Sequence, residues 1–226
     1  MKTFIMAALA MLALTVPAMA DHHGEAVGDK MMPEMSAPET DNSEISTVAE
    51  VGKPAPEFML DDVNGEHVML SALKGKTVVL EWTNHECPYV KKHYDSGNMQ
   101  KLQKEATDDG VVWISIVSSS EGKEGFTTPE EAKAIMAEQA AHPSNKLLDT
   151  NGVIGHLYGA KTTPHMFVID KDGVLVYAGA IDDNNSYKPE SLEGAKNYVR
   201  EALAALKEGK PVENATTQPY GCGVKY

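Results

Sequence analysis

The chain has 226 residues, of which 33 are acidic and 20 are lysine or arginine, and its formal net charge is −13. Binding to a phosphate backbone needs a basic patch, and the sequence offers none, so nucleic-acid binding is excluded as its function. Residues 51–226 have the length of one domain with one sizeable core.

Residues 1–20 predict a signal peptide. An apolar stretch of 13 residues follows Lys2, and the small-residue cleavage site Ala18-Met19-Ala20 precedes Asp21. The stretch is shorter than the ~20 residues of a membrane-spanning helix, so we favour cleavage over an uncleaved anchor. We therefore expect export to the periplasm or beyond the cell, and no membrane span in the mature chain. In such a compartment disulfides persist.

Residues 21–50 predict a disordered acidic linker. They hold eight acidic residues against one lysine, a net charge of −7, and almost no large branched apolar side chains. Such a composition cannot bury enough apolar surface to fold. The remaining domain, residues 51–226, is therefore only mildly acidic.

The new amino terminus is a candidate metal site. Cleavage before Asp21 places His23 third in the mature chain. The free amine, two deprotonated amide nitrogens and the His23 imidazole then supply four coplanar nitrogens, the geometry that Cu(II) and Ni(II) favour. The alternative is a disordered leader that binds no metal.

The domain alternates strands and helices. Strands are expected around the turn Asn64-Gly65, at 57–60 and 67–70, and then at 77–82, 111–117, 147–148, 165–170 and 174–181. Helices are expected at 88–106, at 128–141 behind a Thr-Pro-Glu-Glu capping box, at 151–158 and at 191–207. This order predicts an α/β fold with a mixed central sheet and helices on both faces.

Cys87 is the most informative residue. It follows the apolar run 77–82 and precedes Pro88, which suits the first position of a helix because its missing N–H costs nothing there. The unpaired N–H groups and the positive dipole end of a helix stabilise a thiolate. The sequence therefore predicts that Cys87 caps a helix and acts as a nucleophile.

Four segments form a set of motifs: the start at 51–58, the segment 81–84 before the cysteine, the segment 161–166 and the ending 220–226. They resemble those of exported peroxiredoxin-like redoxins, which have a thioredoxin-like fold and belong to the alkyl hydroperoxide reductase and thiol-specific antioxidant superfamily. The resemblance implies that Pro164 is a cis-proline opposite the thiol, and that the backbone of Thr163 is available to pair with a substrate.

The chain also departs from these families. Val90 replaces the second cysteine of thioredoxins, so no local dithiol exists. Leu80 and Asn84 stand where peroxiredoxins place a proline and a threonine or serine. Arg200 is the only arginine, and it lies in the predicted closing helix rather than near Cys87. The peroxide-binding chemistry of the family is therefore incomplete, and Asn84 enters the candidate site only by its position.

Two further residues complete the candidate site. Glu81 interrupts an apolar strand six residues before Cys87, the spacing at which thioredoxins carry a buried acid, so it is either a desolvated proton shuttle or a carboxylate that faces water. Cys222 lies between two glycines, which make the backbone mobile enough for a resolving cysteine. Its alternatives are a static disulfide with Cys87 or a lone thiol that pairs between chains.

Three functions remain open at this stage. We favour a thiol oxidoreductase in which Cys87 attacks a peroxide or a disulfide and Cys222 resolves the product, with a thiol-bearing reductant or a protein disulfide as partner and no cofactor. The second is a copper-handling protein that combines the thiolate with His85 or His93. The third is a non-catalytic partner module with the same fold.

Overall fold

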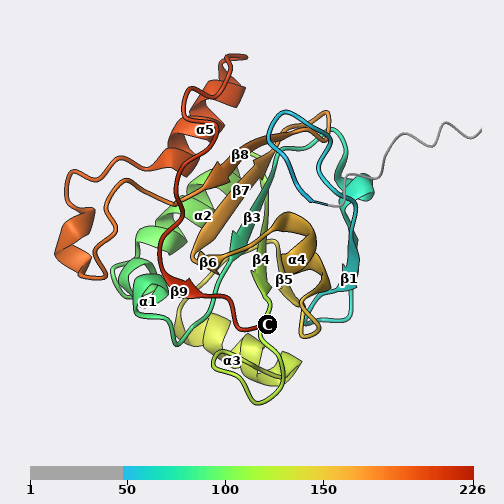
Figure 1. Ribbon diagram of the computed structural model, residues 1–226, viewed down its shortest axis with the longest axis vertical. Helices are drawn as coiled ribbons and strands as arrows, with labels where there is room; N and C mark the ends of the chain where they lie inside the picture. The colour runs from blue at the N-terminus through green and yellow to red at the C-terminus, as the bar shows by residue number, and fades with distance from the viewer. Residues whose placement is uncertain (1–47) are drawn as a thin grey trace, which may run out of the picture. The chain divides into compact units, whose positions relative to one another are not determined.

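Five strands in the order β5-β4-β3-β7-β8 form the central sheet of the computed structural model, which describes residues 48–226 (Figure 1). The parallel pair β3 (Val78–Trp82) and β4 (Val112–Val117) is buried along its whole length, as two nearly continuous apolar runs predict. β5 (Asn145–Leu148) runs parallel to β4. β7 (His165–Ile169) pairs antiparallel with β3, and β8 (Leu175–Gly179) pairs antiparallel with β7. The predicted mixed sheet is confirmed.

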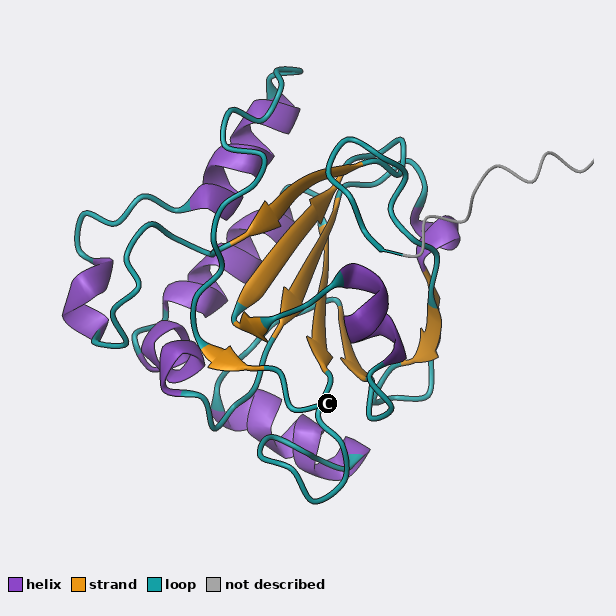
Figure 2. Ribbon diagram, in the orientation of Figure 1, coloured by secondary structure: helices purple, strands orange, loops and turns teal. Residues whose placement is uncertain are grey.

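Helices cover both faces of this sheet (Figure 2). Side chains of α1 (Pro88–Asp95), α2 (Asn98–Asp108) and α5 (Tyr198–Lys207) share one buried apolar cluster with Cys87. On the opposite face, α4 (Val153–Tyr158) packs against the alternate residues of the same strands. Alternation along β3 and β4 divides the core into these two layers because successive strand side chains point to opposite faces.

The amino-terminal hairpin forms as expected. β1 (Met59–Asp61) pairs antiparallel with β2 (His67–Met69), and Gly65 in the turn has φ 83°, a left-handed conformation that glycine adopts without strain. A short 3-10 helix, η1 (Leu70–Leu73), follows.

The prediction of a single helix at 88–106 is wrong, because the structure has two helices there, α1 and α2. Gly97 has φ 73° and separates α1 from α2. The Ser96 hydroxyl donates to the Lys92 carbonyl at 2.7 Å, which takes up one of the last acceptors of α1. A local side-chain to backbone bond and a left-handed glycine end the helix although its apolar periodicity continues.

The closing helix also begins later than predicted. α5 starts at Tyr198, since Asn197 is its N-cap and accepts a hydrogen bond from Arg200 N at 2.9 Å. Ahead of it, a 3-10 helix η2 (Pro189–Leu192) is followed by Gly194 with φ 72°. By contrast, the capping box of Thr128 and Glu131 is present and begins α3 (Pro129–Glu138).

The carboxy-terminal tail adds a strand pair that the sequence does not predict. It returns from α5 as the red segment of Figure 1 and contains β9 (Cys222–Gly223), which pairs antiparallel with β6 (Thr162–Thr163). At the other end of the domain, Ala49 N donates to Leu157 O at 2.9 Å. Between residues 48 and 226, no helix has the length and apolar character needed to cross a membrane.

Candidate active site

Cys87 occupies the strand-to-helix junction that the sequence predicts. It is the N-cap of α1, Pro88 takes the first helical position, and the amides of Val90 and Lys91 donate to the Cys87 carbonyl. The thiol is fully buried and makes no capping bond to the helix. The side chain therefore lies at the positive end of the helix dipole.

Thr163 and Pro164 lie against this thiol. The Thr163–Pro164 peptide bond is cis, and Cys87 Sγ donates to the Thr163 carbonyl at 3.1 Å. These residues are 76 positions apart in the chain and meet because β3 and β7 are neighbours in the sheet.

Cys222 completes the group. It lies opposite Thr163 in the β6–β9 pair, and both cysteines are free thiols. Burial and, after it, the hydrogen bond with the Cys87 side chain together raise the pKa of Cys222 to about 12. The two thiols are thus adjacent, and at neutral pH the Cys222 thiol keeps its proton.

Gly221 permits this approach. Its φ is 136°, and a Cβ at this position would lie 2.0 Å from the Thr163 carbonyl oxygen. Any side chain here would push β9 away from β6. The sequence reading gave the flanking glycines the role of mobility, whereas Gly221 in the structure serves close packing.

Residues 224–226, at the end of the tail, are also hydrogen-bonded to the domain. Lys225 O accepts from Ser120 N at 3.0 Å, Val224 N donates to Lys161 O at 3.2 Å, and the Tyr226 hydroxyl donates to Ala160 O at 2.8 Å. The Tyr226 ring stacks on His156 at 3.9 Å between centroids. The tail that the sequence predicts to be mobile is docked in this structure, with both thiols reduced.

Glu81 is buried rather than facing water. One carboxylate oxygen accepts from the Tyr94 hydroxyl at 2.8 Å. The other accepts from the side chains of Gln103 at 3.2 Å, Trp113 at 2.8 Å and Ser115 at 2.8 Å. Four donors therefore satisfy the two oxygens of this buried carboxylate. Among the hydrogen bonds of residues 48–226, none joins Glu81 to either cysteine.

A cation and a small cavity lie near Glu81. Burial lowers the pKa of Lys146 to about 8, and the charge of Glu81 opposes this shift. The cavity leaves about 20 Å³ for the centres of water molecules, enough for one water. Its lining includes two partners of Glu81, Tyr94 and Ser115, and also Thr83 and His85 from the turn before Cys87.

Asn84 braces the turn that leads to Cys87. Its Oδ1 accepts from Glu86 N at 2.9 Å, and its Nδ2 donates to Glu124 Oε1 at 3.2 Å. Glu86 in turn accepts from Gly125 N at 2.6 Å. These bonds tie the loop between β4 and α3 to the active-site turn, so Asn84 organises the turn and does not contact the Cys87 thiol through a hydrogen bond.

The remaining candidate residues lie elsewhere. His23 falls outside the described residues. Arg200 pairs with Glu105 at 2.8 Å, an ion pair between α5 and α2. Within the described part of the chain, no three His, Cys, Asp or Glu side chains are grouped so that they could hold a metal ion, and this includes His85 and His93.

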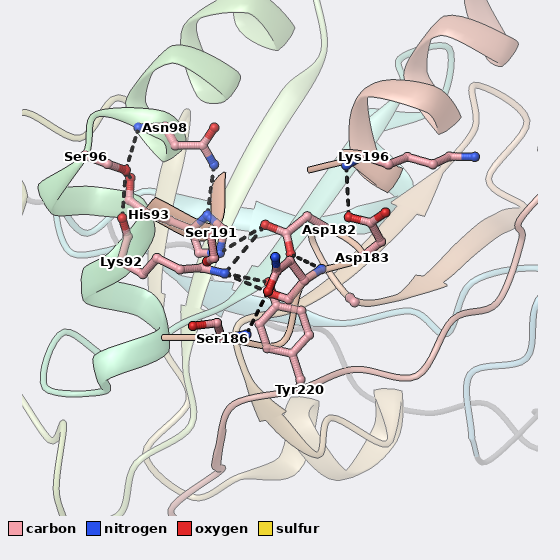
Figure 3. A network of polar contacts seen from close by, with 12 residues as sticks. Lys92, His93, Ser96, Asn98, Asp182, Asp183, Ser186, Ser191, Lys196 and Tyr220 are labelled. Carbon is pink, nitrogen blue, oxygen red and sulfur yellow. Dashed lines mark hydrogen bonds and ion pairs between the residues drawn. The ribbon is translucent and has the colours of Figure 1, made fainter. Parts of the chain in front are cut away.

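One group of interacting polar residues was not recognised from the sequence. The buried Lys92 and Asp182 and the half-buried Tyr220 of the tail form a polar cluster (Figure 3). The Lys92 ammonium group points to Asp182, with 3.7 Å between Lys92 Nζ and Asp182 Oδ2. A lysine in a segment with apolar helical periodicity is a weak signal of burial, and it does not identify the partner.

Comparison with known proteins agrees with this geometry. A family model described as Redoxin matches residues 50–196. The chain belongs to the Redoxin family. This redoxin is 32% identical over 180 residues to the chloroplastic peroxiredoxin Q of Sedum lineare, with 77% of this chain and 87% of that protein covered. It is 28% identical over 129 residues to the thiol-disulfide oxidoreductase ResA of Bacillus thuringiensis, with 56% and 68% covered.

Solved structures give the same fold. An uncharacterized conserved protein from Geobacillus kaustophilus has a TM-score of 0.68 and 30% identity, covering 78% of this chain and 92% of that one. A hypothetical protein from Sinorhizobium meliloti 1021 has a TM-score of 0.67 at 23% identity, with 78% and 94% covered, and supports the fold alone. The redoxin is a thiol-based oxidoreductase of the peroxiredoxin or thiol-disulfide type.

Proposed function

We propose that Cys87 is the nucleophile of this oxidoreductase and that Cys222 of the same chain resolves its oxidised product. The observation that carries the proposal is the register of β6 with β9, which sets Cys222 opposite Thr163 while the Thr163 carbonyl accepts from Cys87 Sγ at 3.1 Å. Two thiols held this way need no large rearrangement to form a disulfide.

The chemistry balances for either oxidant. With a disulfide RSSR, the Cys87 thiolate forms a mixed disulfide and releases one thiolate, and Cys222 then displaces the second as the Cys87–Cys222 bridge forms. With a peroxide ROOH, Cys87 becomes a sulfenic acid as ROH leaves, and Cys222 condenses with it to release water. In both cases a thiol-bearing reductant supplies two electrons and returns the bridge to two thiols.

A disulfide is the oxidant that the geometry favours. The only arginine of the chain is paired with Glu105, so the site lacks the guanidinium group that peroxiredoxins bring to the peroxide. The edge of β6 accepts an extended peptide segment, as its pairing with β9 illustrates. Export, predicted from residues 1–20, suits this function, since an oxidising compartment supplies disulfides.

Glu81 enters the proposal as a proton acceptor. The cavity is lined by hydrogen-bond partners of Glu81 and by the turn before Cys87, and it has room for one water molecule. That water would carry a proton from Cys87 toward Glu81. In this scheme Glu81 acts through Tyr94, Ser115 and that water rather than by direct contact with Cys87.

Single-turnover oxidation tests the two cysteine roles. Reduced wild-type protein, Cys87→Ser and Cys222→Ser are each mixed with one equivalent of glutathione disulfide or of hydrogen peroxide, and the products are identified by mass spectrometry. Wild type should lose two thiols and yield a peptide cross-linked at Cys87 and Cys222. Cys222→Ser should stop at a glutathione adduct or at a sulfenic acid trapped by dimedone, and Cys87→Ser should not react.

The comparison between oxidants then decides the substrate class. Faster loss of thiols with glutathione disulfide than with peroxide supports thiol-disulfide exchange, and the reverse order supports a peroxidase. Steady turnover of Cys222→Ser with the wild-type rate and the same dependence on reductant would remove Cys222 from the mechanism.

A further inference from the structure

The segment just before Cys222 is anchored by buried charges. The side chains of Lys92 and Asp182 are 0% and 2% exposed, and Lys92 Nζ lies 3.7 Å from Asp182 Oδ2. Lys92 Nζ also donates to Asn184 O at 3.0 Å and to the Tyr220 hydroxyl at 3.2 Å, and Tyr220 donates to Asp182 Oδ1 (Figure 3). Tyr220 is thus the group of the tail that reaches this ion pair.

An apolar contact supports the same attachment. The ring of Tyr220 packs against Tyr89 with 5.9 Å between centroids. Tyr89 lies two residues after Cys87, and Tyr220 lies two residues before Cys222. The contacts of Tyr220 with Lys92, Asp182 and Tyr89 form an anchor. This anchor joins the segment that carries Cys87 to the segment that carries Cys222.

A buried ion pair contributes little to the net stability of a fold. Desolvation of two charges offsets most of their attraction, and well-packed apolar residues often do as well or better. Burial lowers the pKa of Lys92, and the charge of Asp182 opposes this shift, as expected for a charge taken out of water beside a counterion. Stability alone therefore does not explain why Lys92 and Asp182 are buried together. Their hydrogen bonds with the Tyr220 hydroxyl give the pair a second role, which is to hold the tail.

His93 lies near Asp182 as a second hydrogen-bond donor. Asp182 Oδ2 and His93 Nε2 lie 3.8 Å apart, both are buried, and neither makes a hydrogen bond. His93 Nδ1 is bonded to Asn98 Nδ2 at 2.8 Å, so the amide donates to Nδ1 and the hydrogen of the neutral ring sits on Nε2. When Tyr220 leaves, Asp182 keeps Lys92 and has His93 within reach, which lowers the cost of release.

We propose that Tyr220 is a positioning residue for Cys222: the Lys92–Asp182 pair holds its hydroxyl and so sets how often the tail is docked on Cys87. The docked tail covers Cys87, which is 0% exposed, and it also presents Cys222 to Cys87. The anchor consequently opposes the first attack on substrate and favours the second, resolving step. This inference rests on the proposed roles of Cys87 and Cys222.

Tyr220→Phe tests the anchor, because it removes the hydroxyl and keeps the ring against Tyr89. Tyr187→Phe is the matched control, since Tyr187 also packs on Tyr89, at 6.1 Å, but is 56% exposed and lies outside the tail. The first measurement is the equilibrium between the Cys87–Cys222 bridge and glutathione redox buffers. Loss of the two hydrogen bonds between the Tyr220 hydroxyl and charged groups should weaken docking of the tail about tenfold, so the equilibrium constant for the bridge should fall by up to about tenfold in Tyr220→Phe and stay unchanged in Tyr187→Phe.

The second measurement is the alkylation rate of reduced Cys87 in a Cys222→Ser background, with and without Tyr220→Phe. Alkylation should be several-fold faster in Tyr220→Phe, although bridge formation in the protein with both cysteines is weaker. A purely structural defect would not produce these opposite changes. Equal values of both quantities in Tyr220→Phe and wild type would overturn the anchor.

Hydrogen exchange of the reduced wild-type protein keeps the proposal testable if Tyr220→Phe does not fold. Amides of residues 219–226 should be protected, and exchange at the rate of an unstructured peptide would contradict the anchor. The proposed function fails separately: it fails if wild type forms no Cys87–Cys222 bridge, whereas the anchor fails if the bridge forms equally well without the Tyr220 hydroxyl.

Discussion

Cys222 lies opposite Thr163 in the register of two short antiparallel strands. Because the Thr163 carbonyl also accepts the hydrogen bond of the Cys87 thiol, one backbone residue holds both sulfur-bearing segments. The tail therefore occupies the edge of β6 at which an extended substrate segment would pair. In the proposed exchange reaction, substrate entry and tail docking would therefore compete for the same backbone groups.

The close approach of Gly221 leads to the first prediction. In Gly221→Ala the new Cβ would lie 2.0 Å from Thr163 O, at a φ of 136° that side chains rarely adopt. Crowding of this kind costs roughly 1–3 kcal/mol, so bridge formation with Cys87 should weaken by about fivefold or more. Gly223→Ala is the control, since nothing lies within 4 Å of its Cβ position. Equal bridge formation in both variants would argue against close packing at Gly221.

The second prediction concerns the four donors around Glu81. Glu81→Gln would turn an amide toward side chains that themselves donate, and the buried mismatch should lower the free energy of unfolding by about 1–3 kcal/mol. Urea unfolding measures this change, with the exposed Glu130→Gln as control.

The same variant tests the proton role of Glu81. If Glu81 accepts a proton from Cys87, the profile of Cys87 alkylation rate against pH should differ between Glu81→Gln and wild type. Superimposable profiles in two folded proteins would remove Glu81 from the mechanism and leave it a purely structural residue.

Two buried histidines predict sensitivity to acid. Burial, aided by the charge of Lys92, lowers the pKa of His93 to about 3, and burial with the charge of Lys161 lowers that of His165 to about 4. An unfolded histidine titrates near 6.5, so below that pH the unfolded state binds more protons. Each histidine should therefore remove roughly 1.4 kcal/mol of stability per pH unit as pH falls from 6.5 toward these values.

Urea unfolding between pH 7 and pH 5 measures this slope. His93→Gln should reduce it, and His142→Gln, a change at an exposed position, should not. A free energy of unfolding that stays constant over this interval would show that the two imidazoles titrate normally.

The capping box of α3 gives the fourth prediction. Thr128 accepts from Glu131 N at 3.3 Å, and Glu131 accepts from Thr128 N at 2.8 Å. Thr128→Ala should cost about 1 kcal/mol of stability. The exposed Thr150→Ala serves as control in the same thermal or urea unfolding measurement, and an equal stability of the two variants would show that the cap contributes nothing.

The sequence by itself determined the local features. Nearly continuous apolar runs predicted β3 and β4, Thr128 and Glu131 predicted the start of α3, and the position of Cys87 before Pro88 predicted the helix cap. Each depends on residues within a few positions of one another, where periodicity and capping chemistry are sufficient. Where a local bond competes with periodicity, as at Ser96 and Gly97, the pattern alone predicted one helix too long.

Only the tertiary structure decided what surrounds the thiol. Cys222 is 135 residues from Cys87 in the sequence, and its place opposite Thr163 depends on the path of the tail from α5 to β6. The four donors of Glu81 and the contact of Tyr220 with Lys92 and Asp182 come from separate elements as well. Hydrophobic periodicity states which residues are buried but not which distant side chains they meet, because partners are chosen by the packing of whole helices and strands.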